Sequence, residues 1–166
     1  QIQEFCESTV DCLWEVLSRR VRQPAPATQN GLVLSLLRLL LGLLTAELPL
    51  APDSKDLSAK EKDLRVDGLF WLALAWSFGC ATDAEGRVLL DRLLRELAQG
   101  RQVKEAYGLL GAEPELRPAA RVQFPEEASV YDYFLGASGR WEPWTRRIGS
   151  FDVPRDAQAH AVIVPT

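Results

Sequence analysis

Apolar residues recur at spacings of three and four over residues 2–20, which is the pattern of a helix that buries one face. The prolines that follow end this first helix, because proline cannot continue one. A second helix is predicted over residues 30–48, with Thr28 or Asn30 as its cap. Its leucines occupy most of the helix circumference, so we expect this helix to lie between neighbouring elements rather than on a surface.

A third helix is predicted to start at the capping-box pattern of Ser58 and Glu61 and to run to about Phe78. Its second half is apolar on all sides, which indicates a central position in the fold. Gly79 is expected to end this helix from the position just beyond it, where glycine is favoured.

A fourth helix follows at once. Thr82 and Glu85 form another capping-box pattern, and Asp83 also favours a helix N-terminus. This helix has an apolar stripe on one side and charged residues on the other, and Gly100 is expected to terminate it. A shorter helix is predicted within residues 103–110.

The pattern changes from Gly111 onward, where prolines interrupt the chain. Residues 130–135 and 159–164 are short and rich in β-forming types, so we expect them to form a hairpin-like pair of strands. Trp141 and Trp144 are expected to anchor this segment on the helices by packing. The predicted fold class is mainly α: a small helical bundle with an irregular C-terminal extension that holds one or two short β-strands.

Composition is typical of a folded protein, with 47% hydrophobic and 25% charged residues among 166. The net charge of −4 and the lack of a basic stripe argue against a nucleic-acid partner. The leucine-rich stretch 31–50 is the one candidate for a membrane span. Arg38 lies inside it and would oppose insertion, so we expect a buried amphipathic helix and no membrane partner.

The chain offers few groups for catalysis or metal binding. Its three cysteines form no CxxC pair and His160 is its single histidine, so no metal site is expected. The odd number of cysteines favours reduced thiols in a cytosolic compartment. No glycine-rich phosphate-binding motif occurs, and we interpret His160 as structural. No catalytic residue is predicted.

Arg87 is the residue with two open interpretations. It is predicted in the first turn of the fourth helix, from where it could reach a phosphate bound on a neighbouring module through charge-assisted hydrogen bonds. The alternative is a surface arginine that pairs with Asp83 or Asp91.

Several segments resemble dynein heavy chains in order and spacing. The stretches Leu32–Leu40, Phe70–Gly79 and Thr82–Arg87 followed by Asp91–Glu96 are similar to three helices of that family. The resemblance continues through four short elements before the third AAA+ module, which are FPEE at 124–127, VYDY at 130–133, WEPW at 141–144 and IVPT at 163–166. Together these cover most of the chain from residue 30 onward.

The resemblance implies that residues 1–110 are the helical lid of the second AAA+ module. Residues 111–166 would then be the connector into the third module. The FPEE and VYDY elements look more like axonemal than cytoplasmic heavy chains. The implied parent is an ATP-driven, minus-end-directed microtubule motor of the cilium axoneme, within the cytoplasm and cytoskeleton. The segment itself is not expected to hydrolyse ATP.

The resemblance also implies partners and binding residues. Nucleotide in AAA+ modules lies between a large subdomain and the lid, so the cofactor would be ATP or ADP with Mg, held by the parent ring. Arg87 looks like the basic lid residue that senses the phosphates, and Val164, Pro165 and Thr166 resemble the loop that meets the adenine of the third module. The implied partners are the neighbouring modules of the same chain, and microtubules and other dynein chains through the parent. Cys80 departs from the family, which usually has a second glycine there.

A second interpretation is a free-standing helical adaptor that binds a partner helix through the leucine-rich face of the second helix. The chain begins with Gln1 rather than Met and ends directly after an apolar run. We therefore expect it to be a segment excised from a longer protein.

Overall fold

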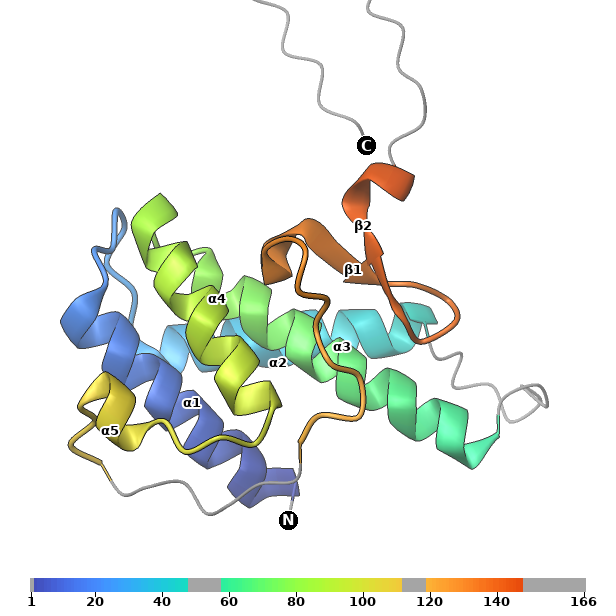
Figure 1. Cartoon of the computed structure of the whole chain (residues 1–166), viewed down its shortest axis with the longest axis horizontal. Helices are drawn as coiled ribbons and strands as arrows, with labels where there is room; N and C mark the ends of the chain where they lie inside the picture. The colour runs from blue at the N-terminus through green and yellow to red at the C-terminus, as the bar shows by residue number, and fades with distance from the viewer. Residues whose placement is uncertain (1, 48–57, 112–118, 148–166) are drawn as a thin grey trace, which may run out of the picture.

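The structure, a computed structural model, describes residues 2–47, 58–111 and 119–147. Figure 1 shows a mainly helical arrangement with one small antiparallel hairpin. Within the described ranges the elements are α1 (Ile2–Arg20), α2 (Gln29–Glu47), α3 (Ala59–Gly79), α4 (Ala84–Ala98), α5 (Lys104–Tyr107), the 3₁₀ helix η1 (Val130–Asp132), β1 (Tyr133–Leu135), β2 (Trp141–Pro143) and the 3₁₀ helix η2 (Trp144–Arg146). The predicted fold class is confirmed.

Helix α3 is the centre of the fold, as its sequence predicts. From Gly68 to Gly79 every residue is buried except Trp76. Helices α1, α2 and α4, the η1 turn and strand β1 all pack against α3. The predicted capping box is present at its start, where the Glu61 carboxylate accepts a hydrogen bond of 2.8 Å from the Ser58 backbone N–H and the Ser58 hydroxyl oxygen accepts one of 3.3 Å from the Glu61 N–H.

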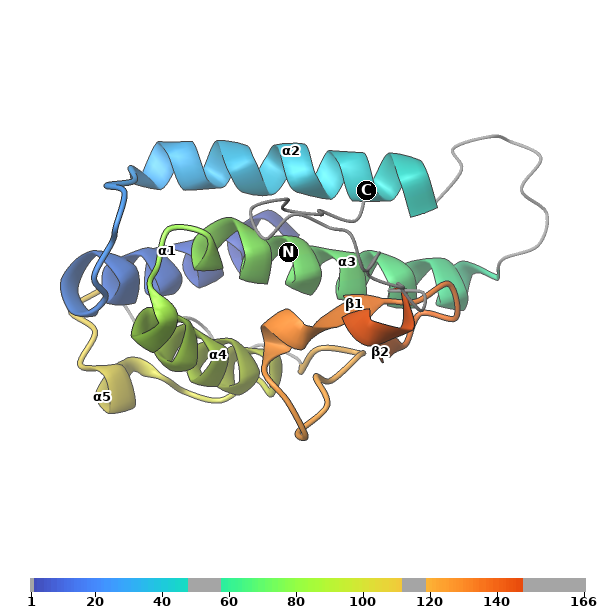
Figure 2. The ribbon, with the colours of Figure 1, turned by 90° about the horizontal axis from the view of Figure 1, so that it is seen from above.

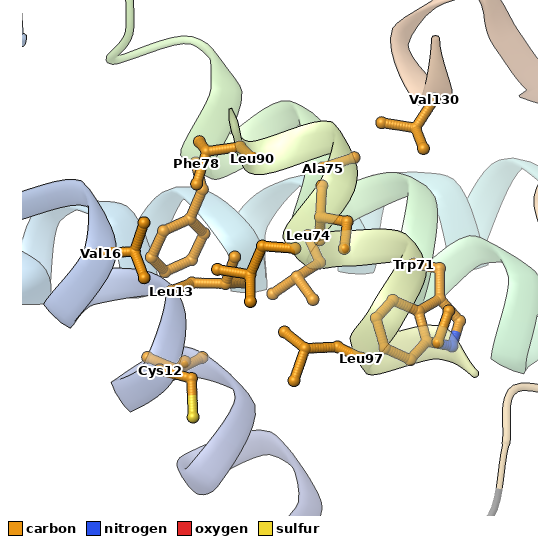
Figure 3. Close-up of a cluster of buried hydrophobic side chains, with 14 of the residues drawn as sticks. Cys12, Leu13, Val16, Trp71, Leu74, Ala75, Phe78, Leu90, Leu97 and Val130 are labelled. Carbon is orange, nitrogen blue, oxygen red and sulfur yellow. The ribbon is translucent and has the colours of Figure 1, made fainter. Parts of the chain in front are cut away.

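The main hydrophobic core lies where α1, α3 and α4 meet. Figure 3 shows Trp71, Leu74 and Phe78 of α3 between side chains from α1 and α4. Their neighbours in this view include Leu13 and Val16 from α1, Leu90 and Leu97 from α4, and Val130 from η1. Because these side chains come from both ends of the sequence, the segment after residue 119 is part of the core rather than an appendage.

Helix α2 does not lie between neighbours, and that prediction is wrong for the described residues. Leu32 and Leu36 are buried, whereas Leu34, Leu37 and Leu41 are 52%, 56% and 65% exposed. Figure 2 shows α2 on one side of α3 and the β1–β2 hairpin on the other. Since α3 covers one side of α2, the outward leucines have no described element against them.

The exposed side of α2 also bears on the membrane question. Among the described residues, the stretch 29–46 is the one helical window whose length and composition alone would allow it to cross a membrane. Only 11% of that window is buried, so the expectation of a buried helix is not met.

The two glycines predicted to end helices serve different purposes. Gly100 has a φ of 70°, and its N–H bonds to the Leu97 carbonyl while the Arg101 N–H bonds to the Glu96 carbonyl, each at 3.0 Å. This pair of bonds is a Schellman motif, so the prediction for Gly100 is confirmed. Gly79 instead is the last residue of α3 itself and does not have a positive φ. Its prediction as the residue beyond the helix is therefore wrong.

Asp83, rather than Thr82, caps α4. The Asp83 carboxylate accepts a hydrogen bond of 2.8 Å from the Gly86 N–H. The Thr82 hydroxyl donates to the Gly79 carbonyl at 2.9 Å and so belongs to the end of α3. Asp83 directly precedes Ala84, the first residue of α4, so its side chain is placed to cap the helix, and its negative charge is favoured by the positive end of the helix dipole.

The hairpin differs from the predicted strand pair. Residues 130–135 are divided between η1 and β1, and β1 pairs antiparallel with β2, so that Tyr133 faces Pro143 and Leu135 faces Trp141. The predicted partner strand at 159–164 lies outside the described residues. The β2 strand was missed because it is only three residues long and ends in proline, which sequence patterns place outside strands.

The two tryptophans of the hairpin pack as predicted. The Trp141 ring stacks on Phe124 with 4.6 Å between ring centroids, and the Trp144 ring lies 5.1 Å from that of Phe134. The Trp141 Nε1 also donates to the Val122 carbonyl at 3.3 Å. A hydrogen bond of 2.7 Å from the Arg121 backbone N–H to the Asp67 carboxylate of α3 fixes the preceding segment.

The central position of α3 predicts a large difference between two leucines. Replacing Leu74, which is fully buried, by alanine should destabilise the chain by about 2–5 kcal/mol because it leaves a cavity. The same substitution at Leu37 on the exposed side of α2 should change the free energy of unfolding by less than about 0.5 kcal/mol. Urea unfolding of both variants measures the difference, and equal losses would contradict the described core.

Candidate functional site

The candidate site lies where the end of α3, the start of α4 and the η1 turn meet. Arg87 projects from the first turn of α4, directly after the tight connection at residues 80–83. Its side chain is exposed, and the backbone N–H of Arg87 bonds to the Asp83 carbonyl at 3.0 Å. The sequence therefore places a fixed cation at the positive end of a helix, where an anion is favoured.

The Arg87 guanidinium is held by α3 and by η1. Its Nε donates to the Gly79 carbonyl oxygen at 3.5 Å, and its guanidinium carbon lies 5.9 Å from the centre of the Tyr131 ring. That distance is within the range of a cation–π contact. A guanidinium with one weak hydrogen bond keeps most of its N–H donors available to a ligand.

The alternative of a surface ion pair does not fit this geometry. Among the ion pairs of the described residues none joins Arg87 to Asp83 or Asp91. The Asp83 carboxylate caps α4, and Asp91 pairs with Arg95 at 3.1 Å. Both candidate partners are thus engaged elsewhere.

Tyr131 fits against Gly79 because glycine has no side chain. A Cβ atom at Gly79 would lie 2.7 Å from the Cζ atom and the hydroxyl oxygen of Tyr131, closer than atoms approach without moving. A side chain at position 79 would therefore clash with Tyr131, a residue more than fifty positions away in the sequence. Sequence reasoning assigned this glycine to helix termination and missed the contact.

The Tyr131 hydroxyl is buried and finds no hydrogen-bond partner in the described part of the chain. Burial raises the pKa of Tyr131 well above its ordinary value of 10.0, the nearby Asp91 carboxylate raises that pKa further, and Arg87 opposes both. The phenol is therefore neutral at physiological pH.

Aromatic rings continue from Tyr131 toward the hairpin. Trp76 makes edge-to-face contacts with Tyr131 and Trp144, with ring centroids 6.0 and 6.3 Å apart. The Arg147 guanidinium carbon lies 4.0 Å from the centre of the Phe134 ring. The cluster joins the end of α3 to η1, strand β1 and η2, so Arg87 borders a packed unit rather than an isolated loop.

Asp91 and Arg95, one turn apart on α4, fasten the segment that carries Tyr131. The Asp91 carboxylate accepts from the Val130 backbone N–H at 2.6 Å and from the Ser129 hydroxyl at 3.2 Å. The Arg95 guanidinium donates to the carbonyl oxygens of Pro125, at 2.5 Å, and Ala128. We name these two side chains the α4 bracket.

The α4 bracket was missed by sequence reasoning. An aspartate and an arginine four residues apart on a helix are typical of a solvated ion pair, and the sequence analysis placed both on the wet side of α4. Nothing local indicates that the backbone of residues 125–130 needs these partners. The backbone groups that these two side chains bind lie 30 to 39 residues away along the chain, beyond the reach of a local sequence pattern.

The described residues place one of the four predicted binding residues. Arg87 lies in the geometry given above, whereas Val164, Pro165 and Thr166 lie outside the described residues, as does His160. Across the described ranges no group of three or more His, Cys, Asp or Glu residues could hold a metal ion. The chemistry available at this corner is anion binding by one guanidinium and a helix N-terminus.

Comparison with known proteins covers most of the chain. A sequence model of the family described as "Dynein heavy chain AAA lid domain" matches residues 2–146. Dynein axonemal heavy chain 3 of Homo sapiens is 30% identical over 114 residues, which is 66% of this chain. Dynein axonemal heavy chain 12 of Rattus norvegicus is 34% identical over 100 residues, which is 58% of this chain. The matched stretch spans 3% of the length of each of these two relatives.

The α4 bracket predicts a measurable loss when it is removed. Asp91→Ala should destabilise the chain by about 1–3 kcal/mol, because it leaves the N–H of the buried Val130 and the Nε of Arg95 without their acceptor. Asp63→Ala removes an ion pair of similar length whose two side chains are 63% and 57% exposed, and should cost less than about 1 kcal/mol. Urea unfolding compares the two, and a smaller loss for Asp91→Ala would contradict the bracket.

Proposed function

This chain belongs to the dynein heavy chain AAA lid domain family, and from that membership we propose that it is the helical lid of the second AAA+ module, with residues 111–166 as the connector into the third module. In this role the chain is not catalytic. It would bind nucleotide together with a large subdomain and pass the resulting movement along the motor ring. The names of the relatives, axonemal heavy chains 3 and 12, support a parent of the axonemal type.

The proposed parent is an ATP-driven, minus-end-directed microtubule motor of the cilium axoneme. The chain would meet ATP or ADP with Mg only within the ring, where the phosphate-binding loops belong to large subdomains. Its direct partners would be the neighbouring modules of the same heavy chain. Microtubules and other dynein chains would be reached through the parent.

The observation that carries the proposal is the position of Arg87. Its guanidinium is exposed at the N-terminus of α4, is directed by the Gly79 carbonyl and the Tyr131 ring, and is not paired with Asp83 or Asp91. A phosphate group would gain charge-assisted hydrogen bonds there, together with the favourable end of the helix dipole. We assign to Arg87 the contact between lid and nucleotide.

The exposed leucines of α2 by themselves fit both a lid and a free-standing adaptor. The extent of the family match favours the lid. Leu34, Leu37 and Leu41 form an apolar strip that a neighbouring subdomain would cover in a ring. The family match begins at residue 2 and so includes α1, α2 and everything that packs on them. The complete bundle, rather than one groove, is what resembles the family.

Loss of the Arg87 side chain should weaken nucleotide binding at the second module. In the intact heavy chain, Arg87→Ala should raise the dissociation constant for ADP at that site by about tenfold to a hundredfold, the usual range for a lost charge-assisted bond. Arg92→Ala removes an exposed arginine from another side of the same helix and should leave the constant unchanged. Occupancy of the second site at graded ADP concentrations, from electron cryo-microscopy of the ring, measures both; an unchanged constant for Arg87→Ala would refute the assignment.

A separate expectation concerns the far end of the connector. We propose that Val164, Pro165 and Thr166 line the adenine pocket of the third module through apolar and backbone contacts. A structure of the ring with the third site occupied should show these three residues against the base. Their placement remote from the adenine would rule the assignment out.

A further inference from the structure

Tyr131 is the point where the Arg87 side chain meets the connector. Within the described residues, the polar and cation–π contacts of that side chain are with the Gly79 carbonyl oxygen and the Tyr131 ring. Gly79 belongs to α3, whereas Tyr131 belongs to η1, which leads directly into β1. Any ligand that moves the guanidinium therefore changes a contact with the connector.

We propose that Tyr131 is a positioning residue: its ring directs the Arg87 guanidinium toward the nucleotide phosphates and links occupancy of that site to the placement of the η1–β1 segment. The inference rests on the proposed function, because it takes Arg87 as the residue that binds nucleotide. It adds a residue and a route of coupling that the role of a lid does not by itself contain.

The ring is fixed well enough to direct another side chain. On one side it abuts the backbone of Gly79, and on another it meets the Trp76 ring at 86°. The backbone on either side of it is held too, since the Val130 N–H donates to Asp91 and the Asp132 carboxylate accepts from the Ser129 N–H at 3.1 Å. A residue constrained in this way offers a rigid face to the guanidinium.

Arg87 in contrast is long and exposed, so its side chain loses rotamer freedom when it binds a ligand. A guanidinium already placed against a rigid ring loses less of that freedom at the moment of binding. The ring face also attracts the cation without using its N–H donors, which stay available for phosphate oxygens. Positioning by a ring thus raises affinity in a way that a salt bridge would not.

Coupling follows from linkage between the two contacts. If bound nucleotide favours one placement of the Arg87 guanidinium, it also favours the placement of η1 that keeps the Tyr131 ring against that guanidinium. By the same linkage, this placement of η1 favours nucleotide binding. The α4 bracket keeps residues 125–130 on α4, so this response is confined to residues 131–135, the rest of η1 and strand β1. The size of the effect is limited by the strength of the cation–π contact, which corresponds to about twofold to fivefold in affinity.

The ring and the hydroxyl of Tyr131 have separable roles. The hydroxyl is buried without a hydrogen-bond partner in the described residues, so it does not hold Arg87. Tyr131→Phe keeps the ring face and removes only that oxygen, and it should retain full nucleotide affinity. Tyr131→Leu keeps an apolar side chain and removes the ring face, and it should lose the positioning. The two variants form a matched pair.

The decisive experiment is a double-mutant cycle in the intact heavy chain, with ADP affinity at the second module as the measurement. Tyr131→Leu should raise the dissociation constant by about twofold to fivefold, whereas Tyr131→Phe should have the wild-type constant. The double variant Tyr131→Leu with Arg87→Ala should bind ADP no more weakly than Arg87→Ala alone. If Tyr131→Leu has the wild-type dissociation constant while Arg87→Ala binds ADP more weakly, the role of Tyr131 is overturned and the proposed function stands. Additive losses in the double variant would also overturn it. An unaffected Arg87→Ala would instead refute both.

A second measurement separates positioning from a general loss of packing. Hydrogen exchange of the backbone amides at residues 130–135 is followed in the intact chain with and without saturating ADP. The change in protection on ADP binding should occur in the wild type and in Tyr131→Phe, and should be absent in Arg87→Ala and Tyr131→Leu. No change in the wild type, or the same change in all four proteins, would overturn the coupling.

Discussion

The structure depends on removing the second half of α3 from water on every side. Eleven residues between Gly68 and Gly79 are buried, and no single helix can cover all faces of another. The chain meets this requirement with α1 and α4 on one part of the surface, α2 on another, and η1 with strand β1 on the remainder (Figure 2). The segment after residue 119 is thus required by the core, although its sequence has no regular pattern.

Covering α3 with irregular chain creates a second problem, since such a segment has few backbone hydrogen bonds of its own. Side chains from the helices supply the partners. Asp91 and Arg95 of α4 bind the backbone of residues 125–130, and Asp67 of α3 accepts from the Arg121 N–H. Burial raises the pKa of the Asp67 carboxyl in spite of that bond. Polar groups that look like ordinary surface charges in the sequence thus hold residues 121–130 in place.

The same arrangement explains why the candidate site is a corner and not a pocket within this chain. Arg87 lies where α3 ends, α4 begins and η1 packs on both helices, and its side chain is exposed. The outward leucines of α2 are exposed as well. The residues that hold Arg87 are structural, and the one that would bind the ligand is exposed.

The sequence by itself determined the helices, the N-terminal cap of α3 and the central position of α3, because spacing of apolar residues and the Ser58–Glu61 pattern are local signals. It also singled out Arg87, from its place in the first turn of α4. Only the tertiary structure decided that α2 lies at the edge, that Gly79 makes room for Tyr131, and that β2 pairs with β1. The reason is the same in each case. These outcomes depend on which distant residues come to lie against a given surface, and a single surface pattern, such as leucines all around a helix, is compatible with more than one set of neighbours.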